Sequence, residues 1–161
     1  MLPSLSNQST IWIFQANRIL NPKEIEFINS KLALFIPEWA AHGTKLKAEF
    51  EVLKNLFVLI GVDENQATAS GCSKDALNKE ILGIGAELGV DFFDRLKIAY
   101  VNENNEIVLA DMATFKTLIQ KDIVRQNTFV YNNLVSTKED LINHWEVQLK
   151  DSWHANLMPI L

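Results

Sequence analysis

The residues best suited to chemistry surround the chain's single cysteine, Cys72, in the run Ser70-Gly71-Cys72-Ser73. This run follows a strand-like apolar segment and precedes a helix-like one, so we expect a tight turn that opens a helix. A thiol there lies near unpaired backbone N–H groups and the positive end of the helix dipole, which favour the reactive thiolate. Asp75, expected in the same first turn, disfavours a second negative charge. Cys72 is therefore either a reactive or ligand-contacting thiol, or a small buried residue beside a capping serine.

A cysteine nucleophile usually needs a base, and His42 is the best candidate for that role. It lies just before a strand that we expect to pair with the strand leading to Cys72. Gly43 lets the backbone turn tightly, Trp39 would shelter the imidazole, and Asp63 would orient it. The alternative is a histidine that binds a backbone carbonyl at a turn.

These two turns support two hypotheses of function. In the first, the protein binds a small ligand or a protein partner, through Trp39, Gly43, Asp63, Ser70, Gly71, Ser73 and Arg95. In the second, it is a thiol enzyme for acyl transfer or thiol chemistry, with Cys72 as nucleophile, His42 as base and Asp75 or Asp63 as the orienting carboxylate. Backbone N–H groups around Ser73 would then stabilise an oxyanion. Whether the protein is an enzyme stays open at this point.

The sequence shows no pattern typical of a metal or cofactor site. The histidines and the cysteine lack the spacing of zinc ligands. Neither a phosphate-binding P-loop nor a dinucleotide-binding glycine motif occurs. We therefore expect no metal and no cofactor.

Length, charge and cysteine content place further limits on function. A chain of 161 residues predicts a single domain over residues 1–161. The net charge of −5 argues against nucleic-acid binding. A single cysteine cannot form an internal disulfide, the first ten residues do not resemble a signal peptide, and no apolar stretch reaches the ~20 residues of a membrane span. We therefore expect a cytoplasmic protein with no membrane span.

The hydrophobic pattern predicts strands and helices in mixed order. Strands are expected at 10–16, 45–53, 57–62, 96–101, 107–110 and 129–131. Helices are expected to begin at Asn21-Pro22, near Ser73, after Asp111 and at Ser136, the last one continuing through Leu141, Trp145, Leu149 and Trp153. Because hairpins outnumber crossovers, the fold class is α+β, with a mainly antiparallel sheet and helices packed on one face.

The C-terminal region suggests a third hypothesis, that the protein is a structural subunit of a homodimer or larger homo-oligomer. Two tryptophans, Trp145 and Trp153, precede an apolar tail over residues 158–161. Such a group could pack across an interface between two copies.

The motifs Trp39-x-x-His42-Gly43 and Ser70-Gly71-Cys72-Ser73-x-Asp75 together resemble those of an uncharacterised family of small bacterial proteins. Arg95 and Ser152-Trp153-His154 also fit this resemblance, which spans nearly the whole chain. Members are sometimes labelled ABC-transporter ATPases, a label that no P-loop supports in this chain. Position 74, often apolar in that family, is a lysine here. The resemblance marks the turns at His42 and Cys72 as the site and names no reaction.

Overall fold

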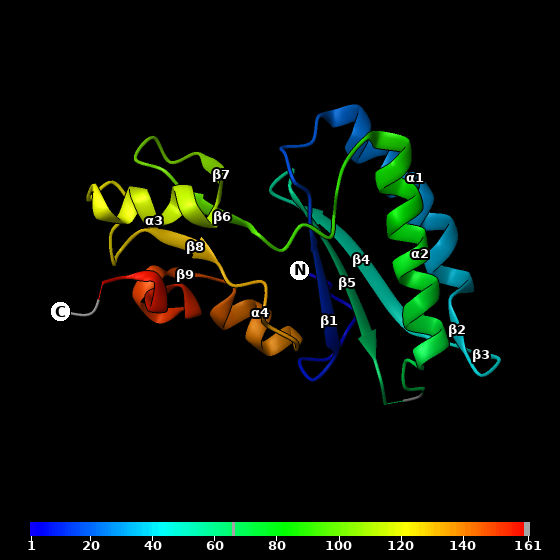
Figure 1. Cartoon of the computed structure of the whole chain (residues 1–161). Coiled ribbons are helices and arrows are strands. Elements are labelled where there is room, and N and C mark those ends of the chain that lie inside the picture. The colour runs from blue at the N-terminus through cyan, green and yellow to red at the C-terminus, as the bar shows by residue number, and fades with distance from the viewer. Residues whose placement is uncertain (66, 160–161) are drawn as a thin grey trace. The chain divides into compact units, whose positions relative to one another are not determined.

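The computed structural model of the chain describes residues 1–65 and 67–159 (Figure 1). Strand β5 (Phe57–Asp63) is the centre of its N-terminal part, because each of its residues is buried. β5 pairs antiparallel with β1 (Thr10–Gln15) on one side and with β4 (Lys47–Leu53) on the other. A strand that is apolar on both faces needs cover on both faces. The remaining elements of this part of the chain provide that cover.

Helices and strands follow one another in mixed order along the described chain. After β1 come α1 (Pro22–Phe35), the 3-10 helix η1 (Ile36–Glu38), β2 (Ala40–Ala41), β3 (Thr44–Lys45), β4, β5 and α2 (Gly71–Leu88). These are followed by β6 (Lys97–Val101), β7 (Ile107–Asp111), α3 (Met112–Gln120), β8 (Phe129–Tyr131), α4 (Lys138–His144), β9 (Glu146–Gln148), η2 (Leu149–Asp151) and η3 (Trp153–Leu157). All strand pairings among them are antiparallel, so the α+β class with antiparallel sheets is confirmed.

The described chain divides into two compact units. The first contains Met1–Asp94 together with the later segment Ser136–Glu139. The second contains Arg95–Val135 and the described residues after Glu139. The expectation of one domain over residues 1–161 stays a prediction.

Helix α1 begins where the sequence predicts, at a complete capping box. The Asn21 side chain accepts the Glu24 N–H at 3.0 Å, and the Glu24 carboxylate accepts the Asn21 N–H at 2.9 Å. Arg18 binds both carboxylate oxygens of Glu24, at 2.9 and 2.7 Å. These hydrogen bonds lower the pKa of Glu24 to about 2. Arg18 also donates to the Leu88 carbonyl at 3.0 Å, so it ties the start of α1 to the end of α2.

Both helices lie on one side of the β1–β5–β4 sheet, and the chain's N-terminus lies on the other side (Figure 1). Trp39, which follows η1, packs edge-on against Trp12 of β1 on the helix side. Two buried leucines of the N-terminal segment, Leu2 and Leu5, pack at Gly61 of β5. Gly61 and Ile60 point to opposite faces because side chains alternate along a strand. β5 is therefore covered on both faces.

Residues 136–139 complete the first unit, although they follow most of the second unit in the sequence. Ile11 donates its N–H to the Ser136 carbonyl at 2.9 Å, and Lys138 donates its own N–H to the Ser9 carbonyl at 2.9 Å. The buried Lys138 ammonium donates to the Leu5 carbonyl at 2.6 Å. This segment thus pairs with the N-terminal residues through the backbone and through a buried charge.

The second unit has its own four-stranded sheet, in the order β7-β6-β8-β9. Its core is formed by apolar side chains from these strands, from α3 and from the C-terminal segment, among them Ile98, Phe115, Val130 and Leu149. The predicted cap of α3 is confirmed, because the Asp111 carboxylate accepts the Thr114 N–H at 2.7 Å.

The long C-terminal helix predicted from Leu141 to Trp153 is wrong. α4 ends at His144, and the chain continues as β9, which pairs with β8. Trp145 is buried, and its indole N–H donates to the Asn133 side chain at 3.0 Å, while Trp153 packs against the core of the second unit. The apolar residues spaced by four in this region are therefore core residues of α4, of a strand region and of 3-10 helices, and do not form one long helix. Of the apolar tail, residues 160 and 161 lie outside the described residues.

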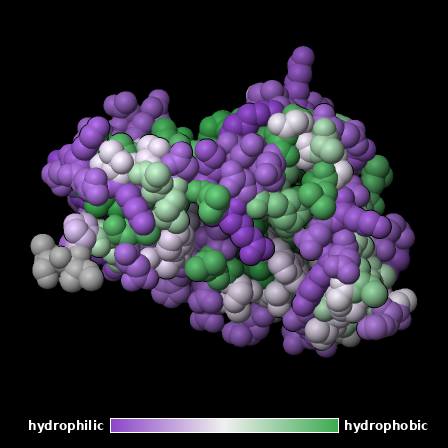
Figure 2. Space-filling view, in the orientation of Figure 1, coloured by the Kyte–Doolittle hydropathy of each residue, from purple (hydrophilic) through white to green (hydrophobic). Residues whose placement is uncertain are grey.

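Within the described residues, no helix has both the length and the apolar character required to cross a membrane. Figure 2 shows hydrophobic side chains in small groups between hydrophilic ones on the face in view. Hydropathy therefore does not mark a site on this face.

His154 is the most deeply buried histidine of the second unit, with 1% of its surface exposed. Its Nδ1 lies 2.7 Å from the Ser152 hydroxyl, and its ring stacks on Trp153 at 3.9 Å between centroids. Burial disfavours the charged imidazolium and lowers the pKa of His154 to about 4.

We expect acid to destabilise the chain through His154. Its pKa is 6.5 when unfolded and about 4 when folded, so the unfolded state binds more protons between these values. The free energy of unfolding therefore falls as the pH drops from 6.5 towards 4, by at most about 3 kcal/mol from this group. Urea titrations at pH 7, 5.5 and 4.5 measure the fall. His154→Asn should be less stable at pH 7 but should show a flatter pH dependence, and equal slopes for both proteins would contradict this assignment.

Candidate functional site

The first candidate turn joins β2 and β3 and contains His42 and Gly43. Ala41 pairs with Thr44, and both residues between them have positive φ, +50° at His42 and +79° at Gly43. Two left-handed residues in a two-residue hairpin form a type I′ turn, in which a glycine at the second position relieves strain. Both residues are exposed. The turn therefore presents the imidazole at the tip of a short hairpin.

The second candidate turn is the start of α2. Ser70 is its N-cap, and its hydroxyl accepts the Ser73 N–H at 3.2 Å. Ser73 is buried, and its hydroxyl donates to the Ser70 carbonyl at 2.8 Å. Both its N–H and its hydroxyl therefore take part in the cap. Because the Ser73 N–H is occupied, an oxyanion would have to use the N–H groups of Gly71 and Cys72, which lack partners within the helix.

Cys72 is exposed. The alternative of a buried cysteine filling the core is therefore wrong. The helix begins at Gly71, two residues before the start expected from the sequence, and this places Cys72 at its second position. The earlier start also leaves no acidic residue in the first turn, so Asp75 does not lie there as expected. Asp75 is exposed and lies three residues after Cys72, which puts both side chains on one side of the helix.

One hydrogen bond joins the two turns. The indole N–H of the buried Trp39, which directly precedes β2, donates to the Ser73 carbonyl at 2.7 Å. Trp39 thus lies beneath the surface and fixes the β2–β3 hairpin against the first turn of α2. Its predicted role in sheltering the imidazole stays a prediction. His42 and Cys72 are exposed residues on the two elements that this bond connects.

The loop between β5 and α2 is held by two neighbouring carboxylates. Asp63 is buried, and it accepts the Lys47 ammonium at 3.0 Å and the Asn65 side-chain amide at 2.6 Å. The Lys47 hydrogen bond is the main cause that lowers the pKa of Asp63. Glu64 accepts the Thr10 hydroxyl at 2.9 Å and the Ala69 N–H at 3.1 Å. These bonds fix the path of the chain into Ser70.

The structure does not join Arg95 to this group. Arg95 is exposed and is the first residue of the second unit, whereas every other predicted site residue belongs to the first. Asp63 was predicted to orient His42, but its side chain forms hydrogen bonds with Lys47 and Asn65. The group brought together thus consists of Trp39, the His42 turn and the start of α2.

Sequence reasoning missed Glu64 and the bridge from Trp39 to Ser73. Glu64 follows a fully apolar strand by one residue, a place where a carboxylate often receives loop N–H groups, and that position was a usable signal. The bridge carries no sequence signal, because Trp39 and Ser73 are 34 positions apart.

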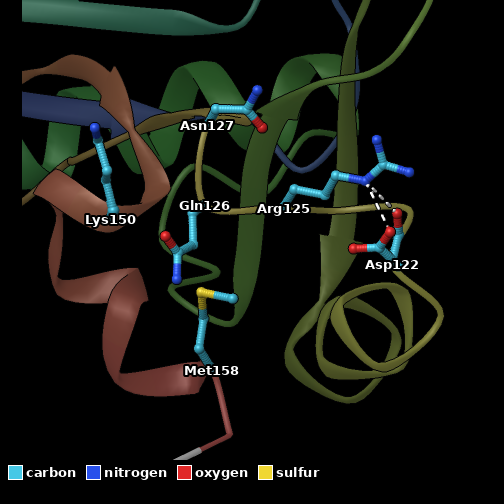
Figure 3. Close-up of a pocket in the computed structure, with 6 residues that line it drawn as sticks. All are labelled: Asp122, Arg125, Gln126, Asn127, Lys150 and Met158. Atoms are coloured by element: carbon cyan, nitrogen blue, oxygen red, sulfur yellow. Dashed lines mark hydrogen bonds and ion pairs between the residues drawn. The ribbon is translucent and has the colours of Figure 1, made fainter. Parts of the chain in front are cut away.

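A hollow of about 480 Å³ lies in the second unit. It is lined by Asp122, Arg125, Gln126, Asn127, Lys150 and Met158. Figure 3 shows that Arg125 turns towards Asp122, with which it forms an ion pair at 3.1 Å. The Lys150 and Asn127 side chains point away from the Met158 side of the hollow (Figure 3). These side chains do not converge on a common point, so the hollow defines no ligand.

Among the described residues, no three histidine, cysteine, aspartate or glutamate side chains are grouped so that they could hold a metal ion. No protein-family model, curated protein or solved structure matches the chain. The resemblance to a family with the Trp39 and Cys72 motifs therefore stays a prediction.

We expect Trp39→Phe to loosen both turns at once. The substitution keeps an aromatic ring but removes the N–H that reaches Ser73, at a cost of about 1–2 kcal/mol in the free energy of unfolding. Hydrogen exchange should speed up at residues 42–44 and 71–74, as measured by mass spectrometry. Trp12→Phe is the matched control, because Trp12 packs edge-on against Trp39 without forming this bridge. Unchanged exchange at both turns would show that the bond does not couple them.

Proposed function

We propose that the protein is a binding module that takes a small ligand or a protein partner at the His42 turn and the start of α2. The observation that carries this proposal is the hydrogen bond from Trp39 to the Ser73 carbonyl, which connects two exposed polar turns through a buried side chain. Binding residues commonly lie on loops that a rigid scaffold positions. Here the scaffold is the buried strand β5 with the two helices that cover it.

The chemistry of the surface favours a ligand with a hydrogen-bond acceptor. At the start of α2, the Gly71 and Cys72 N–H groups point along the helix axis, where the helix dipole is positive. His42 and Lys74 add exposed donors. The β2–β3 hairpin that carries His42 and the start of α2 lie at the same end of the first unit (Figure 1). Asp75, which is also exposed, limits the negative charge that such a ligand can carry. A carbonyl or a singly charged group therefore suits this surface better than a phosphate.

The test is a fragment screen followed by NMR with the ¹⁵N-labelled full chain, using small carboxylic acids and amides as probes. We expect probes that bind to shift the amides of residues 42–44 and 70–74 together, and His42→Ala to weaken binding by about tenfold, since it removes a contact worth about 1.4 kcal/mol. His144→Ala is the matched control, because it removes an exposed histidine from α4 in the second unit. Equal effects of the two substitutions, or shifts confined to other residues, would overturn the proposal.

The exposure of Cys72 favours one alternative, a thiol enzyme. In this alternative His42 takes the proton of the Cys72 thiol, and the sulfur attacks the carbonyl carbon of an activated ester to form a thioester. The C–O bond to the leaving group breaks, and the leaving group takes that proton from His42. Water then hydrolyses the thioester and frees the thiol. The Gly71 and Cys72 N–H groups are the remaining donors for the oxyanion.

This alternative predicts that Cys72 is alkylated faster than an ordinary thiol. Iodoacetamide should alkylate Cys72 about tenfold faster at pH 7 in the native chain than in urea, because an activated nucleophile reacts faster than an ordinary thiol. His42→Ala should slow the native reaction, and Asp75→Asn should speed it by removing a nearby negative charge. Mass spectrometry gives all three rates, since the chain holds a single cysteine. A native rate at or below the unfolded one excludes Cys72 as an activated nucleophile.

A further inference from the structure

The N-terminal strap, which we define as residues 2–5, covers the sheet face opposite the helices. Leu5 donates its N–H to the Leu2 carbonyl at 3.3 Å, and Pro3 occupies the second position of this β-turn. The turn brings the two leucine side chains to the same face. Both are buried, with 1% and 4% of their surface exposed, whereas Pro3 and Ser4 are exposed.

The floor beneath the strap is Gly61, in the middle of β5. A Cβ atom at this position would lie 2.5 Å from a methyl group of Leu5 and 2.9 Å from one of Leu2. Any side chain here would therefore displace the leucines. Since glycine weakens a strand interior, its position at this point indicates a socket for the two leucines.

The wall of the socket is formed by two glutamates of β4 and by Lys138. Glu51 accepts the Leu2 N–H at 3.1 Å, and Glu49 accepts the Ser4 N–H at 3.2 Å. The two glutamates are two residues apart on one strand, and so they lie on one face of it. Their spacing matches the two N–H groups on either side of Pro3, which has none. The Lys138 ammonium binds the Leu5 carbonyl at 2.6 Å on the other side.

The strap is attached by side chains of the socket and not by a β-ladder. A proline between the two bound N–H groups prevents regular strand pairing there. Leu2 has a φ of +49°, a left-handed conformation that is costly for a leucine. Removal of the strap would therefore break none of the backbone pairings of β1, β5 and β4.

We propose that this socket, formed by Gly61, Glu49, Glu51 and Lys138, is a docking site for a Leu-Pro-x-Leu turn and that two copies of this chain exchange their straps through it. The socket fits residues 2–5 of this sequence in side-chain shape, N–H spacing and carbonyl position. A second copy presents the same four residues. Exchange of an identical segment between two copies needs no new surface, because every contact already exists within one chain. It competes with the internal contact, whose effective concentration is about millimolar.

Thiol cross-linking between full-length chains tests this proposal. In a Cys72→Ser background, one chain carries Ser4→Cys on the strap and the other carries Glu49→Cys on the wall. Dibromobimane bridges two nearby thiols and fluoresces when it does. We expect a mixed covalent dimer whose yield rises with protein concentration. A single chain with both substitutions should form the internal bridge, which checks the geometry of the pair.

Substitution of the two strap leucines separates docking from collision. Leu2→Ser with Leu5→Ser on the Ser4→Cys chain should reduce the mixed dimer about tenfold, because that strap can no longer fill the socket. The same two substitutions on the Glu49→Cys chain should raise the yield of mixed dimer several-fold, because the strap of that chain no longer competes for its own socket. The collision control pairs Ser4→Cys with Glu87→Cys, at an exposed position of α2. Circular dichroism confirms that each variant is folded.

Two results would overturn strap exchange. One is a mixed dimer no more abundant than in the Glu87→Cys control while the internal bridge forms normally. The other is a yield of mixed dimer that does not change when the leucine substitutions are made on either chain. A failure of the internal bridge would overturn the socket itself.

Discussion

The structure of the first unit depends on the complete burial of β5, which must be covered on both faces and paired along both edges. The two helices and Trp39 cover one face, and the N-terminal strap covers the other. Because apolar surface is costly in water, each covering segment gains its stability from the same strand. The candidate site and the socket lie on opposite faces of this sheet. The candidate site lies at the start of α2 on the helix face, and the socket lies beneath the strap on the other face.

The fold was predictable where local chemistry decides it. Asn21, Pro22 and Glu24 specify the start of α1 by hydrogen bonds within a few residues, and the run at 57–62 predicted a central strand by its composition alone. The C-terminal region was not predictable in this way. Its apolar residues recur every fourth position, as in a helix, but the pairing of β9 with β8 depends on residues far away in the sequence. Long-range pairing overrides local propensity there.

The candidate site was predictable in its location but not in its bonding. The glycine after His42 and the serines around Cys72 indicated two turns, and both exist. The hydrogen bond that couples them uses an indole and a backbone carbonyl, groups that leave no pattern in a sequence. The role of the N-terminal leucines escaped the sequence analysis for a similar reason. Their significance depends on Gly61, which looks like an ordinary small residue until its neighbours across the sheet are known.

The return of residues 136–139 to the first unit has a consequence for how the chain is made. A ribosome delivers the chain from its N-terminus, so β1 and the strap emerge long before Ser136 and Lys138, with which they form hydrogen bonds. During that interval the Leu5 carbonyl and the Ile11 N–H must be satisfied by water. Three of the four strands of the second unit, β6, β7 and β8, are synthesised in the meantime. The β1–β5–β4 sheet can therefore pair early, but the last segment of the first unit joins it only after most of the second unit has been made.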